Sequence, residues 1–195
     1  MRVTNWIGSA AALTAMLLLA GCGATKIAYK PMDGSAPAAA KSVALQVTDE
    51  RPADKGGSEK AQVGQVRGSY GIPSAVKDSS PTVATTTVTD AVTDALKQAG
   101  VSVQAGAKET LVAAVQHYWM DGMAGYKATV TVKYTLQDAS GKALWTKDVS
   151  GGAGGALIFK SAESMAQDMF ANALTDMAKK SSEDFKSSAF QTAVK

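Results

Sequence analysis

The sequence has one cysteine and one histidine among its 195 residues. A zinc site built from these residue types needs several of them and a structural disulfide needs two cysteines, so both are excluded. The chain has few arginines and a formal net charge of only +3, which argues against nucleic-acid binding. A hydrophobic content of 46% with 19% charged residues instead fits one globular domain preceded by a targeting segment, with no metal or cofactor.

The N-terminus has the pattern of a secretory signal peptide. Arg2 and the free amine give a short positive start, and residues 3–18 form an apolar segment. A transmembrane helix needs about 20 apolar residues. Here the apolar run ends at Gly21-Cys22 and a polar segment with glycine and proline follows. The segment is therefore too short to remain as a span, and we expect residues 1–21 to be removed.

The end of this segment, Leu19-Ala-Gly-Cys22, resembles the lipobox of bacterial lipoproteins. In that family the chain is cut just before the cysteine, whose thiol carries the acyl chains. Small residues leave the backbone open to a protease, and a thiol is the soft nucleophile that forms a thioether. The alternative, an inert buried thiol, fits less well because Cys22 is the only cysteine and stands where the apolar run ends. We predict cleavage between Gly21 and Cys22 and lipid attachment at Cys22.

Acyl chains would be the main anchor of such a protein. Loss of Arg2 with the signal peptide leaves a nearly neutral chain, which has little electrostatic attraction to a membrane. One acyl chain binds a bilayer reversibly and two or more bind stably. The resemblance implies three chains on Cys22. Because residue 23 is Gly rather than the Asp that commonly retains such lipoproteins in the inner membrane, it also implies the outer membrane of a Gram-negative envelope, on the periplasmic face.

The residues after the cysteine predict a flexible connection. Residues 22–41 are rich in Ala, Gly, Pro, Ser and Lys, without hydrophobic periodicity over 34–41. This composition is typical of a tether that lets a folded body stand away from the bilayer. Residues 42–195 remain as a single domain, large enough to bury a stable core without disulfides.

Period-two alternation of apolar and polar residues predicts strands over 43–49, 101–103, 111–119, 127–136 and 143–150. The alternation over 127–136 is complete, which is typical of an antiparallel sheet with one solvated face. Between the first two strands, residues 53–80 are rich in Gly, Ser and Lys and predict a long loop, with only 62–67 extended.

Two helices are predicted from apolar residues spaced three and four apart. The first ends at Gly100 and begins either at Pro81 or near Thr89, because the β-branched residues 82–89 also permit an extended start. The second follows Ser161, and its apolar stripe should cover the dry face of the sheet. This order predicts an α+β fold, a two-layer sandwich of a mainly antiparallel sheet covered by two helices.

Four patterns could carry chemistry, and each has a simpler structural explanation. His117 could act as a base, but no Gly-x-Ser-x-Gly motif accompanies it. Asp90 and Asp94 lie off the apolar stripe of their helix, which favours a solvated face. Residues 151–155 are Gly-rich but lack the signature of a phosphate loop, so a flexible strand-to-helix connection is expected. The stripe of Met165, Met169, Met177 and Phe170 is expected in the core, or as a ligand surface if exposed.

Three charged residues flank the predicted loop and form the candidate partner surface. Asp49 and Arg51 end the first strand, where they could pair with each other or cap the loop. Arg51 and Arg67 are the only arginines after residue 21. Arginine binds carboxylates and carbonyls through a rigid fork of donors, so these residues suit contact with an envelope protein or lipid.

The chain also resembles the YajG-type family of bacterial outer-membrane lipoproteins over most of its length. The resemblance rests on several segments: Leu19-Ala-Gly-Cys22, Val43 to Arg51 with its Asp-x-Arg ending, Thr89 to Val103, the strand from Tyr126, and Asn172-Ala-Leu-Thr-Asp-Met177. It implies the location and the fold but no activity. The expectation is a non-enzymatic, outer-membrane-anchored lipoprotein that binds or scaffolds an envelope partner. The alternative is an accessory lipoprotein of lipid or glycan transport, with an apolar ligand between helices and sheet.

Overall fold

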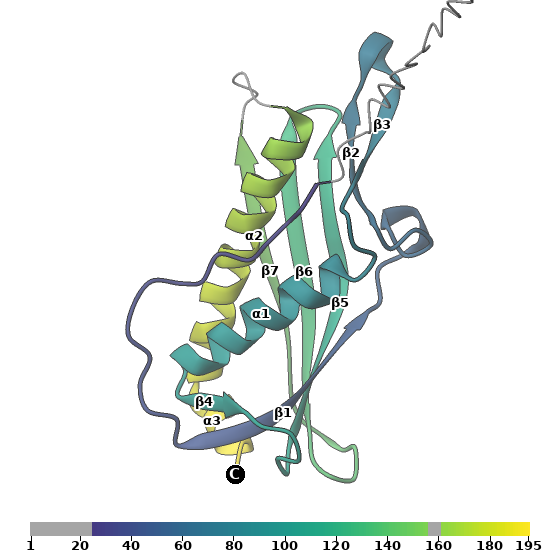
Figure 1. The fold of residues 1–195 in the computed structure, drawn as a ribbon. Helices are drawn as coiled ribbons and strands as arrows, with labels where there is room; N and C mark the ends of the chain where they lie inside the picture. Colours follow the sequence, from purple (N-terminus) through teal and green to yellow (C-terminus); the bar gives the residue numbers. More distant parts are fainter. Residues whose placement is uncertain (1–24, 156–160) are drawn as a thin grey trace, which may run out of the picture.

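The computed structural model describes residues 25–155 and 161–195, and the predicted signal peptide, Gly21 and Cys22 lie outside them. The described residues contain a seven-stranded sheet with two long helices on one face (Figure 1). The strands are β1 (Lys41–Asp49), β2 (Gln62–Arg67), β3 (Pro73–Lys77), β4 (Val101–Val103), β5 (Thr110–Gly122), β6 (Tyr126–Gln137) and β7 (Ala143–Gly155). The helices are α1 (Val83–Gln98), α2 (Ala162–Lys186) and α3 (Ser188–Ala193). The predicted α+β fold with two covering helices is confirmed.

Strand β5 is the centre of the sheet. On one side it pairs antiparallel with β6, which pairs antiparallel with β7. On its other side β5 pairs in parallel with two strands, first with β1 over 110–115 and then with β2 over 120–122. The sheet is therefore mixed: its longest pairings, β5–β6 and β6–β7, are antiparallel as predicted, and β1 and β2 add parallel pairings with β5. Alternation reveals which side chains share a face but not the direction of the neighbouring strand, so the sequence could not predict the parallel pairings.

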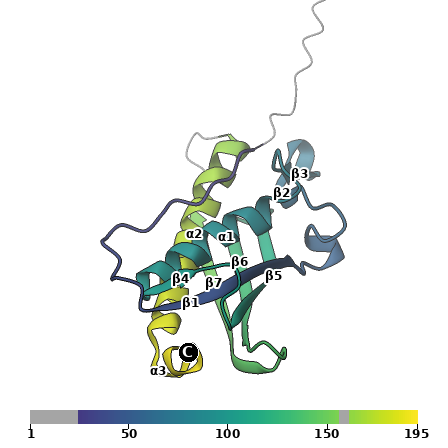
Figure 2. The same ribbon diagram turned by 60° about the horizontal axis from the view of Figure 1, so that its bottom comes forward.

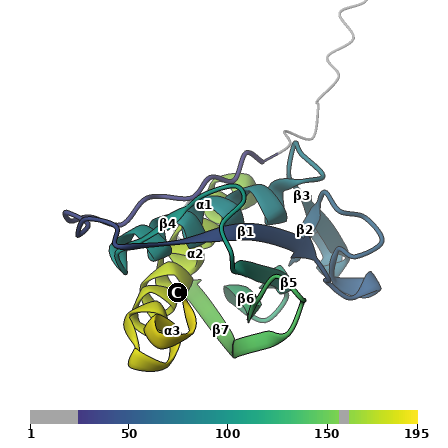
Figure 3. The same ribbon diagram turned by 90° about the horizontal axis from the view of Figure 1, so that it is seen from below.

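The core lies between the sheet and the pair α1 and α2 (Figure 2). Tyr118 of β5 stacks on Phe170 of α2 with ring centroids 4.4 Å apart, and the Tyr134 hydroxyl bonds to Ser181 at 2.8 Å. The stripe of Met165, Met169, Met177 and Phe170 is buried, as the core interpretation predicted. Viewed from below, the short helix α3 lies beside β7 (Figure 3), where Phe190 packs edge-on against Trp145.

One open alternative about secondary structure is decided, and two expectations are corrected. The β-branched residues before Thr89 are helical, because α1 begins at Val83. The loop predicted over 53–80 contains the β2–β3 hairpin, whose second strand exposes most of its residues and so gives no alternation signal. Residues 151–155 belong to β7 rather than to a flexible connection. A Cβ on Gly151 would lie 2.2 Å from the Ala173 carbonyl oxygen, so glycine allows β7 to pack directly on α2.

Candidate functional site

The N-terminal segment is held against the body from its first described residue. Thr25 forms a parallel bridge with Asp78, and its backbone N–H donates to the Lys77 carbonyl at 3.0 Å. The Asp78 carboxylate accepts the Ile27 N–H at 2.8 Å, and the carbonyl of Thr25 accepts the Ser79 N–H at 2.8 Å. Thr25 and Ile27 are buried. This end of the predicted tether is therefore fixed to the base of the β2–β3 hairpin.

A second carboxylate fixes the segment further along, on helix α1. Asp94 accepts the Tyr29 hydroxyl at 2.7 Å and the Met32 N–H at 2.8 Å. Burial, followed by the Asp94 carboxylate, raises the pKa of the Tyr29 hydroxyl far above its ordinary value. The Asp90 side chain is exposed, as predicted, but Asp94 is a docking residue instead of part of a solvated face. Residues 25–32 thus differ from the free tether expected from their composition, because two distant aspartates supply partners that composition does not reveal.

Asp49 and Arg51 form a buried node between the end of β1 and the start of β2, the two strands that pair in parallel with β5. The Arg51 guanidinium donates to both Asp49 oxygens at 2.9 Å each. It also donates to the carbonyls of Lys60 at 2.9 Å and Gln62 at 3.1 Å. A Cβ at Gly56 would lie 2.5 Å from Arg51 Nη1, so the loop closes tightly over the side chain. Arg51 both pairs with Asp49 and holds the loop, the two alternatives that the sequence left open.

The node has little exposed surface for a partner. The Arg51 side chain has no exposed area, and that of Asp49 is 12% exposed. Burial by itself raises the pKa of Asp49, but hydrogen bonds from Arg51 and Lys60 outweigh it and hold the pKa below its ordinary value. The carboxylate therefore stays ionised and paired. Arg51 cannot contribute to the candidate partner surface in this structure, because the loop encloses it.

Arg67 is the third predicted surface residue, and it does lie on the surface. It ends strand β2, is exposed, and donates from Nε to the Met123 carbonyl at 3.1 Å. This bond links the hairpin to the turn between β5 and β6. Beyond it, the hairpin tip carries the fully exposed Tyr70 and Ile72, which is 65% exposed. The periodicity of the sequence does not single out Tyr70 and Ile72, although their position beside Gly68 and Gly71 is typical of an exposed turn.

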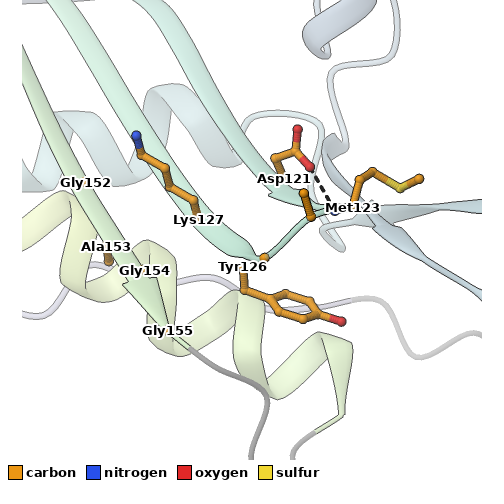
Figure 4. Close-up of a pocket in the computed structure, with 10 residues that line it drawn as sticks. Asp121, Met123, Tyr126, Lys127, Gly152, Ala153, Gly154 and Gly155 are labelled. Carbon is orange, nitrogen blue, oxygen red and sulfur yellow. Dashed lines mark hydrogen bonds between the residues drawn. The ribbon is translucent and has the colours of Figure 1, made fainter.

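An open groove of about 670 Å³ lies at the same end of the sheet (Figure 4). The β5–β6 turn forms one side, where Asp121 accepts the Met123 N–H at 2.9 Å. The end of β7, Gly152-Ala-Gly-Gly155, forms the other side, and Tyr126 lies between the two sides. The lining is mainly backbone and apolar side chain, with Asp121, Tyr126 and Lys127 as its polar residues.

His117 lies on the face of the sheet opposite the helices, two residues from Trp119 along β5. It is half-buried beside the loop residue Lys55, whose ammonium lies 4.9 Å from the Trp119 ring centroid. Burial, and then the charge of Lys55, lowers the pKa of His117. Within the part of the chain that the structure describes, the imidazole has no hydroxyl or carboxylate partner, and no three metal-ligating side chains gather.

Comparisons with known proteins support the fold. No protein-family model matches the chain, and no curated protein matches it. A solved protein of family DUF330 from Xanthomonas campestris is similar with a TM-score of 0.56 at 14% identity, over 87% of this chain and 93% of that one. This likeness shows a shared fold and nothing further.

Two further solved proteins have TM-scores below 0.5, which is too low to indicate a shared fold. The PelC dodecamer from Paraburkholderia phytofirmans has a TM-score of 0.37 at 16% identity, over 76% of this chain and 96% of that one. A lipoprotein from Neisseria meningitidis has a TM-score of 0.30 at 17% identity, over 66% of this chain and 90% of that one.

Neither of the long helices in the described ranges combines the length and the apolar character needed to cross a bilayer.

Proposed function

We propose that this chain is a lipoprotein of the Gram-negative envelope, anchored by acyl chains on Cys22, which binds or scaffolds an envelope partner and catalyses no reaction. One observation carries the proposal: Leu19-Ala-Gly-Cys22 ends an apolar segment three residues before Thr25, where the structure fixes the chain to the folded body. An anchor at that position would hold the whole domain at a membrane. Membership of the YajG-type family is part of the proposal and rests on the sequence motifs.

The proposed location is the outer membrane, on the periplasmic face, because residue 23 is Gly. Labelling of growing cells with radioactive palmitate should mark the parent chain and not the Cys22→Ser variant, which should also leave the membrane fraction. A Gly23→Asp variant is the matched control for sorting: it should keep its label and move to the inner membrane. An unlabelled parent chain, or a Cys22→Ser variant that fractionates like the parent, contradicts the anchor.

The proposed partner surface is the face of the sheet opposite the helices. Strand β7 pairs only with β6 among the described strands. Helix α2 partly covers its other edge, where Asp176 accepts the Gly152 N–H and Lys180 donates to the Ser150 carbonyl, each at 3.0 Å. Asp148 is exposed in this strand, on the outer face. A photo-crosslinking amino acid in place of Asp148 should yield one recurrent adduct of defined mass in intact cells. The same amino acid in place of the exposed Asp90 on α1 is the control, and equal adducts at both positions contradict a specific surface.

The alternative function, carriage of an apolar ligand between helices and sheet, finds no supporting observation. The layer between them is filled by fully buried side chains of both elements, among them Tyr118, Phe170 and Met177. The groove in Figure 4 lies at the end of the sheet instead. The scaffolding function is therefore the one that the described geometry supports best.

A further inference from the structure

The tip of the β2–β3 hairpin exposes apolar side chains in a defined backbone conformation. Tyr70 is fully exposed and Ile72 is 65% exposed. Tyr70 has φ of +60°, in the left-handed region that non-glycine residues rarely adopt. The turn is closed by the Gly68 N–H, which donates to the Ile72 carbonyl at 2.8 Å. The hairpin therefore presents a large aromatic and a large aliphatic side chain to whatever lies beyond the body.

The course of the N-terminal segment relates this tip to the proposed anchor. The bridge between Thr25 and Asp78 is parallel, so the chain passes Thr25 in the same direction as β3, away from the tip. The described chain therefore begins at the end of this bridge that lies toward the tip. In Figure 1 the first described residues begin beside the hairpin and then cross the helical layer. The described chain thus begins near the hairpin, and Cys22 is three positions before its first residue in the sequence.

Chain lengths set a limit on how far the body can stand from the bilayer. Cys22 is three residues from Thr25, so its Cα lies at most about 11 Å away. The tip residue Ile72 is six residues from Asp78, about 20 Å along an extended strand. Even if the N-terminal residues extend fully along the hairpin, the tip reaches about 9 Å beyond Cys22. This length is enough to cross the headgroup layer on one side of a bilayer, which is about 5–8 Å thick.

We propose that the hairpin tip, residues 68–72, is a membrane-contacting element that inserts Tyr70 and Ile72 into the headgroup region of the leaflet holding the acyl chains of Cys22. The inference rests on the proposed lipid anchor. It assigns the occupant of this apolar tip as phospholipid.

The side chains around the tip suit this environment. Tyrosine is enriched at membrane interfaces, where its ring lies among the acyl chains and its hydroxyl meets water and headgroups. Arg67 at the base of the tip and Lys26 beside Thr25 are exposed cations that can meet lipid phosphates. Ala124 in the neighbouring β5–β6 turn is exposed as well, and Arg67 binds this turn through the Met123 carbonyl. The tip and the turn form one surface at the anchored end.

The test uses the acylated protein, processed to begin at Cys22, in vesicles of phosphatidylethanolamine and phosphatidylglycerol. Acylation consumes the thiol of Cys22, the only cysteine, so an introduced cysteine is the only site for an environment-sensitive fluorophore. Tyr70→Cys and Ile72→Cys place the probe at the tip. Ala139→Cys is the matched control, since it is an exposed turn residue between β6 and β7 at the opposite end of the sheet. Flotation with the vesicles reports the anchor separately.

The expected result is a blue-shifted emission at positions 70 and 72 on membrane binding, with quenching by lipids that carry a spin label near the headgroup. Position 139 should show neither change. If the chain floats but the tip probes behave like the probe at position 139, the tip does not contact lipid and the inference is overturned while the anchor stands. If the parent chain does not float and its Cys22 reacts with the fluorophore, the anchor fails and the inference fails with it.

Discussion

Replacement of Arg51 by alanine tests whether a buried guanidinium holds the sheet together where β1 and β2 separate. The side chain has no exposed area and makes four hydrogen bonds, two of them to Asp49. Its removal leaves Asp49 with Lys60 as its remaining cation, at 3.2 Å. It also deprives the carbonyls of Lys60 and Gln62 of their donor. The loop over 52–60 then loses the group around which it closes.

The expected loss of stability follows from the cost of leaving one partner of a buried pair behind. That cost is about 3–5 kcal/mol. We expect the lower end, about 3 kcal/mol, because Lys60 is 40% exposed and still compensates part of the Asp49 charge. In a domain of this size, each kcal/mol lowers the melting temperature by about 2–4 °C, so the midpoint should fall by about 6–12 °C.

Thermal unfolding of the soluble fragment 23–195, followed by circular dichroism, measures this effect. Arg67→Ala is the matched control, because it removes the other arginine of the fragment, which is exposed and makes one hydrogen bond. Its stability should change by no more than about 0.5 kcal/mol. Equal melting temperatures for Arg51→Ala and Arg67→Ala would refute the structural role of the buried node.

The same pair predicts a dependence on pH. Burial favours a higher pKa for Asp49, but the bonds from Arg51 lower it below the ordinary 3.8 in the folded state. A carboxyl group whose pKa is lowered by folding stabilises the fold at pH values above its pKa in the unfolded chain. This stabilisation is lost as the pH falls through its pKa in the folded chain. The fragment should therefore lose stability on acidification below about pH 4, and Arg51→Ala should lose less over that range.

Three further outcomes are expected elsewhere in the chain. Gly151→Ala should destabilise the fragment by about 1–3 kcal/mol in the same melting assay, because the added Cβ would meet the backbone of α2. Gly152→Ala is its control and should fold normally, because the atom nearest to its added Cβ lies 3.7 Å away. NMR titration of His117 should give a pKa below 6.5, and Lys55→Gln should raise this pKa only in part, because burial is the larger cause. A His117 pKa that Lys55→Gln leaves unchanged contradicts the effect of Lys55 on His117. Asp94→Ala removes the acceptor that holds the N-terminal segment and should speed tryptic cleavage there, as followed by mass spectrometry.

The docked N-terminal segment changes how the proposed anchor would work. A free tether of 20 residues could extend to about 70 Å, which would let the body move well away from the bilayer. The bonds from Thr25 to Lys77 and from Ile27 to Asp78 leave two residues between Cys22 and the folded body. The proposed anchor would then hold the domain close to the membrane in a restricted orientation, which is the geometry that the hairpin inference requires.

Much of the fold could be predicted from local patterns. The alternation over 127–136 correctly assigns Val130 and Tyr134 to the buried face of β6 and Lys133 to the exposed face. The three-and-four spacing after Ser161 correctly predicts α2, and the Ser161 hydroxyl accepts the Ser164 N–H at 3.2 Å as an N-cap. Gly100 ends α1 with φ of +73°, as expected for a glycine after a helix. Each of these features depends on residues that are close together in the sequence.

The sequence by itself determined the motif at Cys22, the faces of the long strands and the amphipathic helices, because periodicity and motifs are properties of contiguous residues. Only the tertiary structure decided that Arg51 is enclosed and that the sheet is mixed. It alone showed that the segment after the motif is docked, because Ile27 and Met32 meet aspartates 51 and 62 residues away. A pattern in one stretch of chain carries no information about which distant side chain will complete its hydrogen bonds, and folding alone brings those partners together.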